Sequence, residues 1–252
     1  AEATPVRNVR ARVHLGADGG ARHRLDALAA GIEFGDARGA FSIGADAPFQ
    51  VDASVDATAT AKGWSATARA SGPLESLDTV ATVRAAATAT HPAQSLDARA
   101  SIRPLAAWPL GALDASVSAL DLSAFASALP ATALTGEAHA TTTGIDVPAS
   151  VSVALANARA GRWNEGLLPV RSLRAELRAR PDDPSVVDVQ ELSAELGAAA
   201  SAAGSIVGRG RWARPDWNVD VELRQVQPAA LDARAGSAVV SGRAAFTGTG
   251  FA

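Results

Sequence analysis

The strongest constraint on the fold is an alternation of apolar and polar residues that recurs in short segments along the chain. In NVDVELRQV, residues 218–226, Val219, Val221 and Leu223 are each followed by a charged residue. The pattern recurs in FQVDASVDAT, SLDARASIR, SVSVAL and SLRAELRAR, at residues 49–58, 95–103, 150–155 and 172–180. Because successive side chains of a strand point to opposite faces, each segment predicts a strand with one apolar and one polar face. Such strands are typical of antiparallel sheets.

Turn-forming residues lie between the alternating segments. They cluster in GADGG, SGP, PDDP and RPDW, at residues 16–20, 71–73, 181–184 and 214–217. Short strands with frequent turns predict an all-β fold. Two stretches have helical spacing instead, DLSAFASALP at 121–130 and PAALDARAG at 228–236. The second opens with Pro228, which suits the first turn of a helix, and we expect one short helix in each stretch.

One segment of the chain recurs at an offset of 106 residues. Residues 108–144 align without a gap with residues 214–250, and both pass from an alternating strand through helical spacing to a glycine-containing strand. The identical pairs include Pro109 with Pro215, Asp114 with Asp220, Gly136 with Gly242, Thr141 with Thr247, and Gly144 with Gly250. A duplicated β unit predicts an elongated array. We therefore divide the chain into a β segment over 1–94 and a repeat-containing segment over 95–252, continuous with the first.

Composition limits what can cover the apolar faces of these strands. Hydrophobic residues make up 48% of the 252 residues, but much of this is alanine, only 4% are aromatic, and Cys, Met and Tyr are absent. A sheet normally buries its apolar face against a second sheet or helices, so the residues alone favour a β-sandwich or β-solenoid. The expected helices are too few to cover a sheet of this length.

The sequence offers no reactive site, so we expect neither an enzyme nor a cofactor or metal. The four histidines are far apart in sequence and outside the spacings of metal ligands. GRGRWA at 208–213 matches a dinucleotide-binding pattern only formally, because Pro215 follows closely and no βαβ unit surrounds it, and we interpret it as a turn. The formal net charge of −3 and the absence of a basic run argue against a nucleic-acid partner.

Five tryptophans lie in or beside expected turns. They are Trp64, Trp108, Trp163, Trp212 and Trp217. We interpret them as packing residues at strand ends rather than as a ligand site, because a large amphipathic ring in that position needs no ligand to explain it.

Several longer phrases together resemble one known family. They are ALDLSAFASALPATALTGEAHATTTG at 119–144, GRWNEGLLPVRSLRAELRA at 161–179, ELSAELGAAASAAGSIVGRGRW at 191–212 and PDWNVDVELRQVQPAALDA at 215–233. They resemble the TamB family (translocation and assembly module subunit TamB), which belongs to the AsmA-like, bridge-like lipid transfer proteins. The chain departs from the family where Gln227 precedes Pro228, a place where the family often has Asp-Pro.

The resemblance implies a fold and a cellular setting. It implies an elongated, curved, taco-shaped and mostly antiparallel β-sheet with an apolar concave face and one or two short helices. The chain would be a section of the periplasmic part of a longer protein in the Gram-negative envelope, anchored in the inner membrane through an N-terminal segment outside these residues.

The resemblance also implies a function. The apolar groove would carry phospholipid acyl chains between the inner and outer membranes as a passive, non-catalytic conduit. The alternative is a scaffold for the assembly and secretion of outer-membrane and autotransporter proteins, with an outer-membrane barrel partner of the BamA type. A third reading is a structural β-solenoid with a dry core. The hypothetical lipid-groove residues are Val51, Val55, Leu96, Ile102, Val117, Val151, Val153, Leu155, Leu173, Leu177, Val219, Val221 and Leu223.

Overall fold

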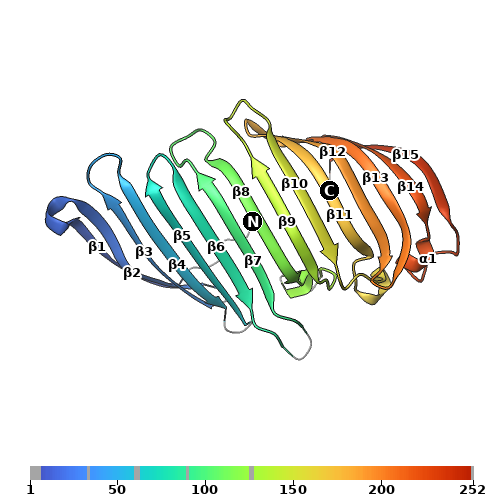
Figure 1. Ribbon diagram of the computed structural model, residues 1–252, viewed down its shortest axis with the longest axis horizontal. Helices are drawn as coiled ribbons and strands as arrows, with labels where there is room; N and C mark the ends of the chain where they lie inside the picture. The colour runs from blue at the N-terminus through green and yellow to red at the C-terminus, as the bar shows by residue number, and fades with distance from the viewer. Residues whose placement is uncertain (1–6, 33–34, 60–62, 89–90, 125–127, 251–252) are drawn as a thin grey trace. The chain divides into compact units, whose positions relative to one another are not determined.

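The chain is all-β, as the alternation predicts. The computed structural model describes residues 7–32, 35–59, 63–88, 91–124 and 128–250. Fifteen strands form one open sheet in which each strand is hydrogen-bonded to its neighbours in chain order (Figure 1). Consecutive strands are antiparallel, because short connections return the chain alongside itself.

The chain divides after residue 113 into two units. The first contains β1 (Arg7–Ala17), η1 (Asp18–Gly20), β2 (Arg22–Ile32), β3 (Gly35–Gly44), β4 (Gln50–Ala59), β5 (Trp64–Pro73), β6 (Leu77–Ala85) and β7 (Gln94–Ile102). β8 (Leu110–Leu120) spans the division. The second contains η3 (Leu122–Ala124), β9 (Leu134–Thr141), β10 (Ala149–Asn157), η4 (Trp163–Glu165), β11 (Val170–Arg180), β12 (Asp183–Ala198), β13 (Ser201–Ala213), β14 (Asp216–Val226), α1 (Pro228–Leu231) and β15 (Val240–Thr249).

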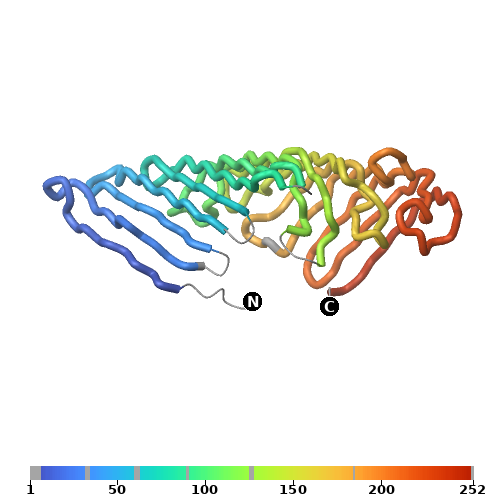
Figure 2. Tube along the Cα trace, turned by 90° about the horizontal axis from the view of Figure 1, so that it is seen from below, coloured from blue at the N-terminus to red at the C-terminus, as the bar shows by residue number. Residues whose placement is uncertain are grey.

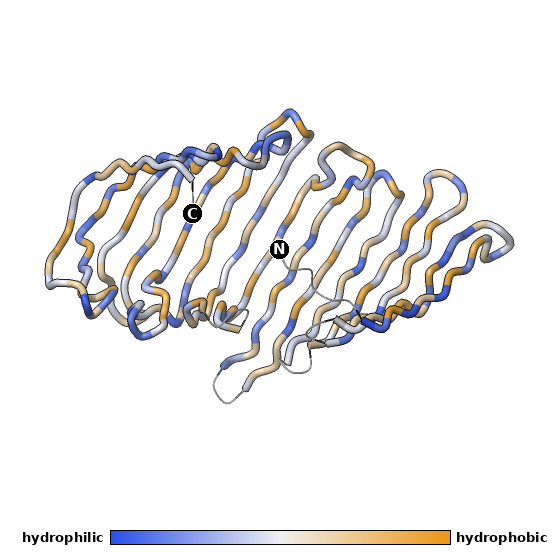
Figure 3. Tube along the Cα trace, turned by 180° about the vertical axis from the view of Figure 1, so that it is seen from behind, coloured by the Kyte–Doolittle hydropathy of each residue, from blue (hydrophilic) through white to orange (hydrophobic). Residues whose placement is uncertain are grey.

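The five alternating segments all lie in strands. They fall in β4, β7, β10, β11 and β14. Figure 3 shows hydrophobic and hydrophilic residues alternating along the strands of each unit. The turn predicted at 71–73 is wrong in position, because β5 continues to Pro73, which pairs with Gln50 of β4, and the turn follows at 74–76. A proline is tolerated at a strand end, where its missing N–H breaks no ladder bond.

The short helices are only partly as expected. α1 (Pro228–Leu231) confirms the start of the helix expected over 228–236, but it ends at Leu231 and does not extend to Gly236. Among the described residues of the stretch 121–130, the 3-10 turn η3 lies at its start, while 125–127, the middle of the expected helix, lie outside the described residues. At the start of this stretch, the Oδ1 atom of Asp121 accepts hydrogen bonds from the backbone N–H groups of Ser123 (3.0 Å) and Thr132 (3.1 Å). These bonds tie the end of β8 to the residues before β9.

The two segments aligned at an offset of 106 residues share their local geometry. β8 begins and ends 106 residues before β14, and β9 begins 106 residues before β15. Ala119 and Gln225 occupy matching positions, with φ of 53° and 49°. The N–H of Ala119 donates to Thr135 Oγ1 at 3.1 Å, and that of Gln225 donates to Ser241 Oγ at 2.9 Å. The same side-chain bond therefore accompanies the same left-handed backbone position in both segments.

Candidate functional site: an uncovered apolar face

The registers of the second unit align the apolar positions of β9 to β15 into three continuous rows. The first row is Ala140, Val151, Leu177, Val189, Gly210, Val219 and Phe246. The second is Ala138, Val153, Ala175, Leu192, Gly208, Val221 and Ala244. The third is Gly136, Leu155, Leu173, Ala194, Ile206, Leu223 and Gly242. No residue of the three rows is polar, and we call this surface the apolar face.

The apolar face has no second layer over it within the described residues. The strands there all belong to the one sheet, and the helical turns η3, η4 and α1 are three or four residues each, in connections between strands. α1 contacts β12 and β13, and Figure 1 places it at the strand ends. Phe246, on the last strand of the sheet, is 52% exposed. Contiguous apolar surface without a covering layer is typical of interaction and ligand-binding sites.

The apolar and the charged faces of the second unit differ in exposure. Figure 2 shows the strands of the second unit bending along their length. In β9 the apolar alternate positions are half-buried and the polar ones exposed, and β14 follows nearly the same pattern. No layer covers the apolar residues within the described part of the chain, so neighbouring strands of the same sheet alone reduce their exposure.

Two glycines of the apolar face allow β13 and β14 to approach each other closely. A Cβ atom at Gly210 would lie 2.6 Å from the carbonyl oxygen of Asn218, and one at Gly208 would lie 3.0 Å from that of Asp220. These glycines belong to GRGRWA, so the turn predicted at 208–213 is wrong: the segment lies within β13. The physical reason for its glycines is the close approach of β14, which leaves no room for a side chain.

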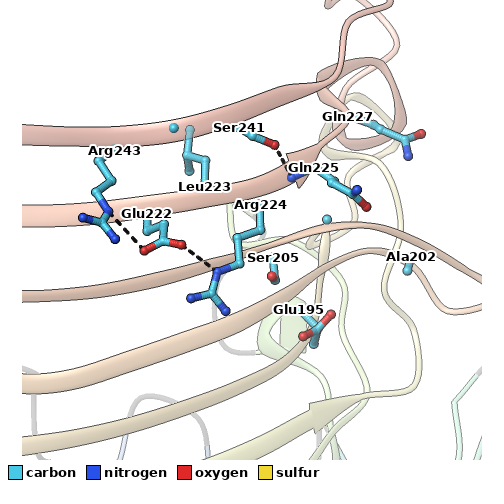
Figure 4. Close-up of a pocket in the computed structure, with 12 residues that line it drawn as sticks. Glu195, Ala202, Ser205, Glu222, Leu223, Arg224, Gln225, Gln227, Ser241 and Arg243 are labelled. Atoms are coloured by element: carbon cyan, nitrogen blue, oxygen red, sulfur yellow. Dashed lines mark hydrogen bonds and ion pairs between the residues drawn. The ribbon is translucent and has the colours of Figure 1, made fainter.

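The opposite face of the second unit is charged and solvated. Glu222 accepts hydrogen bonds from Arg224 at 2.9 Å and from Arg243 at 3.3 Å, as Figure 4 shows. These bonds, the one from Arg224 above all, lower the pKa of Glu222 below its usual range. Glu195, Ser205, Glu222, Arg224 and Arg243 line a shallow hollow there. Both arginines of the hollow form ion pairs with Glu222, and these pairs account for the charged residues gathered there. Ion pairs exposed to solvent contribute little to stability.

His139 also lies on the charged face. Its Nδ1 atom is 2.6 Å from Asp114 Oδ1 and its Nε2 atom is 3.7 Å from Glu137 Oε2. The hydrogen bond to Asp114 raises the pKa of His139 above 6.5, with the nearby carboxylate charges acting in the same direction. The described residues contain no cluster of three or more His, Cys, Asp or Glu that could hold a metal ion.

This pair gives a prediction for pH dependence. Because the pKa of His139 is raised in the folded state, its contribution to stability is fully present below the unfolded pKa and is lost as pH rises through the folded value. An NMR titration of the imidazole should give a midpoint above that of an unfolded peptide, and Asp114→Asn should bring it down. An unchanged midpoint in Asp114→Asn would show that Asp114 is not the cause.

The first unit has a similar apolar face, but its side chains are smaller. Its rows are Phe41, Ala53, Ala70, Thr79 and Ala100; Gly39, Val55, Ala68, Ala81 and Ala98; and Ala37, Ala57, Ala66, Val83 and Leu96. Alanine dominates these rows, as the composition indicates, and Thr79 interrupts one of them. The first unit therefore offers less apolar surface per strand than the second.

The structure groups most of the predicted groove residues. The predicted residues of β10, β11 and β14 all lie in the three rows of the second unit, and Val55 and Leu96 lie in rows of the first. Val117 of β8 alternates with the exposed Ser116 and Ser118, and Ile102 pairs with Leu77. Val51 differs, because it is only 2% exposed and is not accessible to a ligand as it stands.

Sequence reasoning missed several members of the apolar face. Val189 and Leu192 lie on β12, where a register shift places Gln190 and Glu191 between them and breaks the alternation. Phe246 lies in SGRAAFTGT, which has no clear period. Only their pairing with apolar residues on neighbouring strands places these residues on the apolar face. That pairing is known from the register of the strands and not from the sequence.

The tryptophans lie near strand ends. Trp212 and Trp217 face each other across β13 and β14. A Cβ atom at Gly248 would lie 2.5 Å from Trp217 Cζ2, so the Trp217 ring covers that glycine. Trp64 begins β5, and Trp163 lies in η4 and is exposed. For Trp217 these contacts favour the packing role.

Comparisons with known proteins give no family. No protein-family model matches the chain, and neither a curated protein nor a solved structure matches it. Within the described ranges, no helix is both long enough and apolar enough to span a membrane.

Proposed function

We propose that the chain is a section of a passive lipid conduit, in which the apolar face holds phospholipid acyl chains. The observation that carries the proposal is the set of three uninterrupted apolar rows across β9 to β15, with no layer over them in the described part of the chain. Adjacent strands are about 4.8 Å apart, so these seven strands make an apolar strip about 30 Å long.

The chemistry of the strip suits acyl chains better than a compact ligand. Removing an acyl chain from water is worth about 0.8 kcal/mol per CH₂ group, and this gain is not directional. A strip without polar side chains offers an acyl chain no preferred position, so the acyl chain can move along the rows. The charged headgroup finds no partner in the three rows and would remain at their margin, in water. No step in this process requires catalysis.

We further propose that the chain belongs to a TamB-like protein of the Gram-negative envelope. The support is the set of sequence phrases quoted above together with an antiparallel sheet that has one apolar and one charged face. In that setting the conduit would run through the periplasm between an inner-membrane anchor and an outer-membrane barrel partner of the BamA type.

Photo-crosslinking at two adjacent residues tests the lipid-binding proposal. Val221 lies in the second apolar row, and Asp220 lies on the opposite face of the same strand. A photoreactive residue at position 221 should form adducts with phospholipid in the cell envelope, and one at position 220 should not. Adducts at position 220 alone, or at neither position, would contradict the proposal.

A further inference from the structure

The two margins of the apolar face are built differently. At one end of the strands of the second unit, β8 and β9, β10 and β11, and β14 and β15 are joined by the long connections 121–133, 158–169 and 227–239. We call this end the loop margin. At the other end, β11 and β12 are joined by residues 181–182, and β13 and β14 by residues 214–215. We call that end the turn margin. The lengths of the connections decide which margin can be covered.

The apolar side of the sheet is covered at the loop margin. Leu196 lies two residues after Ala194 of the third row, on the same side of β12, and is 5% exposed. Val226, at the end of β14, is 7% exposed. Leu173 and Leu223 of the third row are half-buried by comparison. The sheet is a single layer, and α1 of the third connection contacts β12 and β13, so the connections supply this cover.

Asn157 places the first two connections on the apolar side of the sheet. It lies two residues after Leu155 of the third row, so its side chain leaves β10 on the same side. This buried side chain accepts hydrogen bonds at Oδ1 from the N–H groups of Ala133 at 3.0 Å and Arg159 at 3.1 Å. Ala133 belongs to the first connection and Arg159 to the second. The backbone of both connections therefore lies over the end of the apolar side.

The three connections of the loop margin are also bonded to one another. The N–H of Ala131 in the first connection donates to the carbonyl of Gly166 in the second at 2.8 Å. The N–H of Ala233 in the third connection donates to Asn164 Oδ1 in the second at 2.9 Å. Hydrogen bonds thus join the first connection to the third through the second, and the loop margin is closed by a wall of backbone.

The turn margin has no comparable wall between β11 and β14. Beyond the first apolar row, the register continues through Val187, Trp212 and Trp217, and the two tryptophans are half-buried. The connections 181–182 and 214–215 contain two residues each, as in tight hairpins, and are too short to fold back over the face. The apolar rows therefore reach water at this margin, beside Trp212 and Trp217.

We infer that the apolar face holds phospholipid in one orientation, with the headgroup at the turn margin and the acyl chains directed toward the loop margin. This orientation rests on the proposed lipid binding and adds the position of the headgroup. A charged headgroup loses its hydration under the backbone of the loop margin, which is costly without a partner, and keeps it at the turn margin. Trp212 and Trp217 mark that margin and retain their packing role. Lipid then enters and leaves the face sideways, between β11 and β14.

NMR of the full chain with two spin-labelled phosphatidylcholines tests this orientation. One carries the nitroxide on the headgroup, and the other near the end of an acyl chain. The reporters are the indole N–H signals of Trp212 and Trp217 at the turn margin and of Trp163, which lies in the second connection at the loop margin and is 53% exposed. Single Trp→Phe variants assign the signals. A water-soluble nitroxide, measured without lipid, corrects each signal for its general exposure.

After this correction, the headgroup label should broaden the signals of Trp212 and Trp217 at least threefold more than that of Trp163. The acyl-chain label should broaden the methyl signals of Leu173 and Leu223 in the third row. Equal broadening of the three tryptophans by the headgroup label, or stronger broadening of Trp163, would overturn the orientation. If the acyl-chain label still broadened the two leucines, lipid binding itself would stand. Absence of broadening at both leucines would contradict lipid binding and the orientation together.

Discussion

Val153→Asp is expected to reduce phospholipid binding at least tenfold. Val153 lies in the second apolar row between Ala138 and Ala175, so an acyl chain on the apolar face would contact it. A carboxylate next to an acyl chain loses water without gaining a partner, which costs several kcal/mol. The measurement is the amount of phospholipid that co-purifies with each variant, with titration of a fluorescent fatty acid as a second readout.

The matched control for this change is Ala154→Asp. Ala154 is adjacent on β10 but lies on the charged face, between Glu137 and Arg174. We expect normal lipid binding in this variant, and equal binding by the two variants would contradict the assignment of the faces. The free energy of unfolding of Val153→Asp should fall by only about 1 kcal/mol, since the new carboxylate remains hydrated in the lipid-free protein. A loss above about 4 kcal/mol would instead indicate a dry, covered core, as in a β-solenoid.

Asp121→Ala is expected to cause the largest loss of stability among single changes at connections in the second unit, about 2–4 kcal/mol. Asp121 is only 2% exposed, and its Oδ1 atom accepts bonds from the N–H and the hydroxyl of Ser123 and from the N–H of Thr132. Alanine would leave these donors without an acceptor in a partly buried site. Urea unfolding measures the effect.

Two further variants separate the hydrogen bonds from the general effect of removing a charge. Asp121→Asn keeps an oxygen acceptor and should lose less than Asp121→Ala. Asp146→Ala removes an exposed carboxylate and should change the free energy of unfolding by less than about 0.5 kcal/mol. If Asp121→Ala were as stable as Asp146→Ala, the loop from Asp121 to Thr132 would not depend on these bonds.

The alternation predicts which side chains share a face, because a strand has only two faces and a period of two residues. Val219, Val221 and Leu223 are assigned to one face on this ground alone, and they lie together in the structure. The offset of 106 residues is also visible without coordinates, since Asp114, Gly136 and Thr141 recur at that distance. The fold class, and the face of the sheet on which most groove residues lie, therefore follow from local sequence.

Features that depend on pairing between strands do not follow from local sequence. The bulge that separates Val189 from Leu192 and the glycines opposite Val219 and Val221 are consequences of the neighbouring strand. The loop at Asp121 depends on Thr132, which is eleven residues away. Nothing in the alternation shows whether a second layer covers the apolar face, which is the property on which the proposed function rests.

The most direct test of lipid binding is NMR of the valine methyl groups in the presence of phospholipid. Val153, Val219 and Val221 lie in the apolar rows, whereas Val207 lies on the opposite face, between Ser193 and Glu222. We predict nuclear Overhauser contacts from acyl-chain methylene protons to the methyl groups of Val153, Val219 and Val221, and none to those of Val207. Contacts to Val207 alone, or to none of the four valines at saturating lipid, would contradict the conduit.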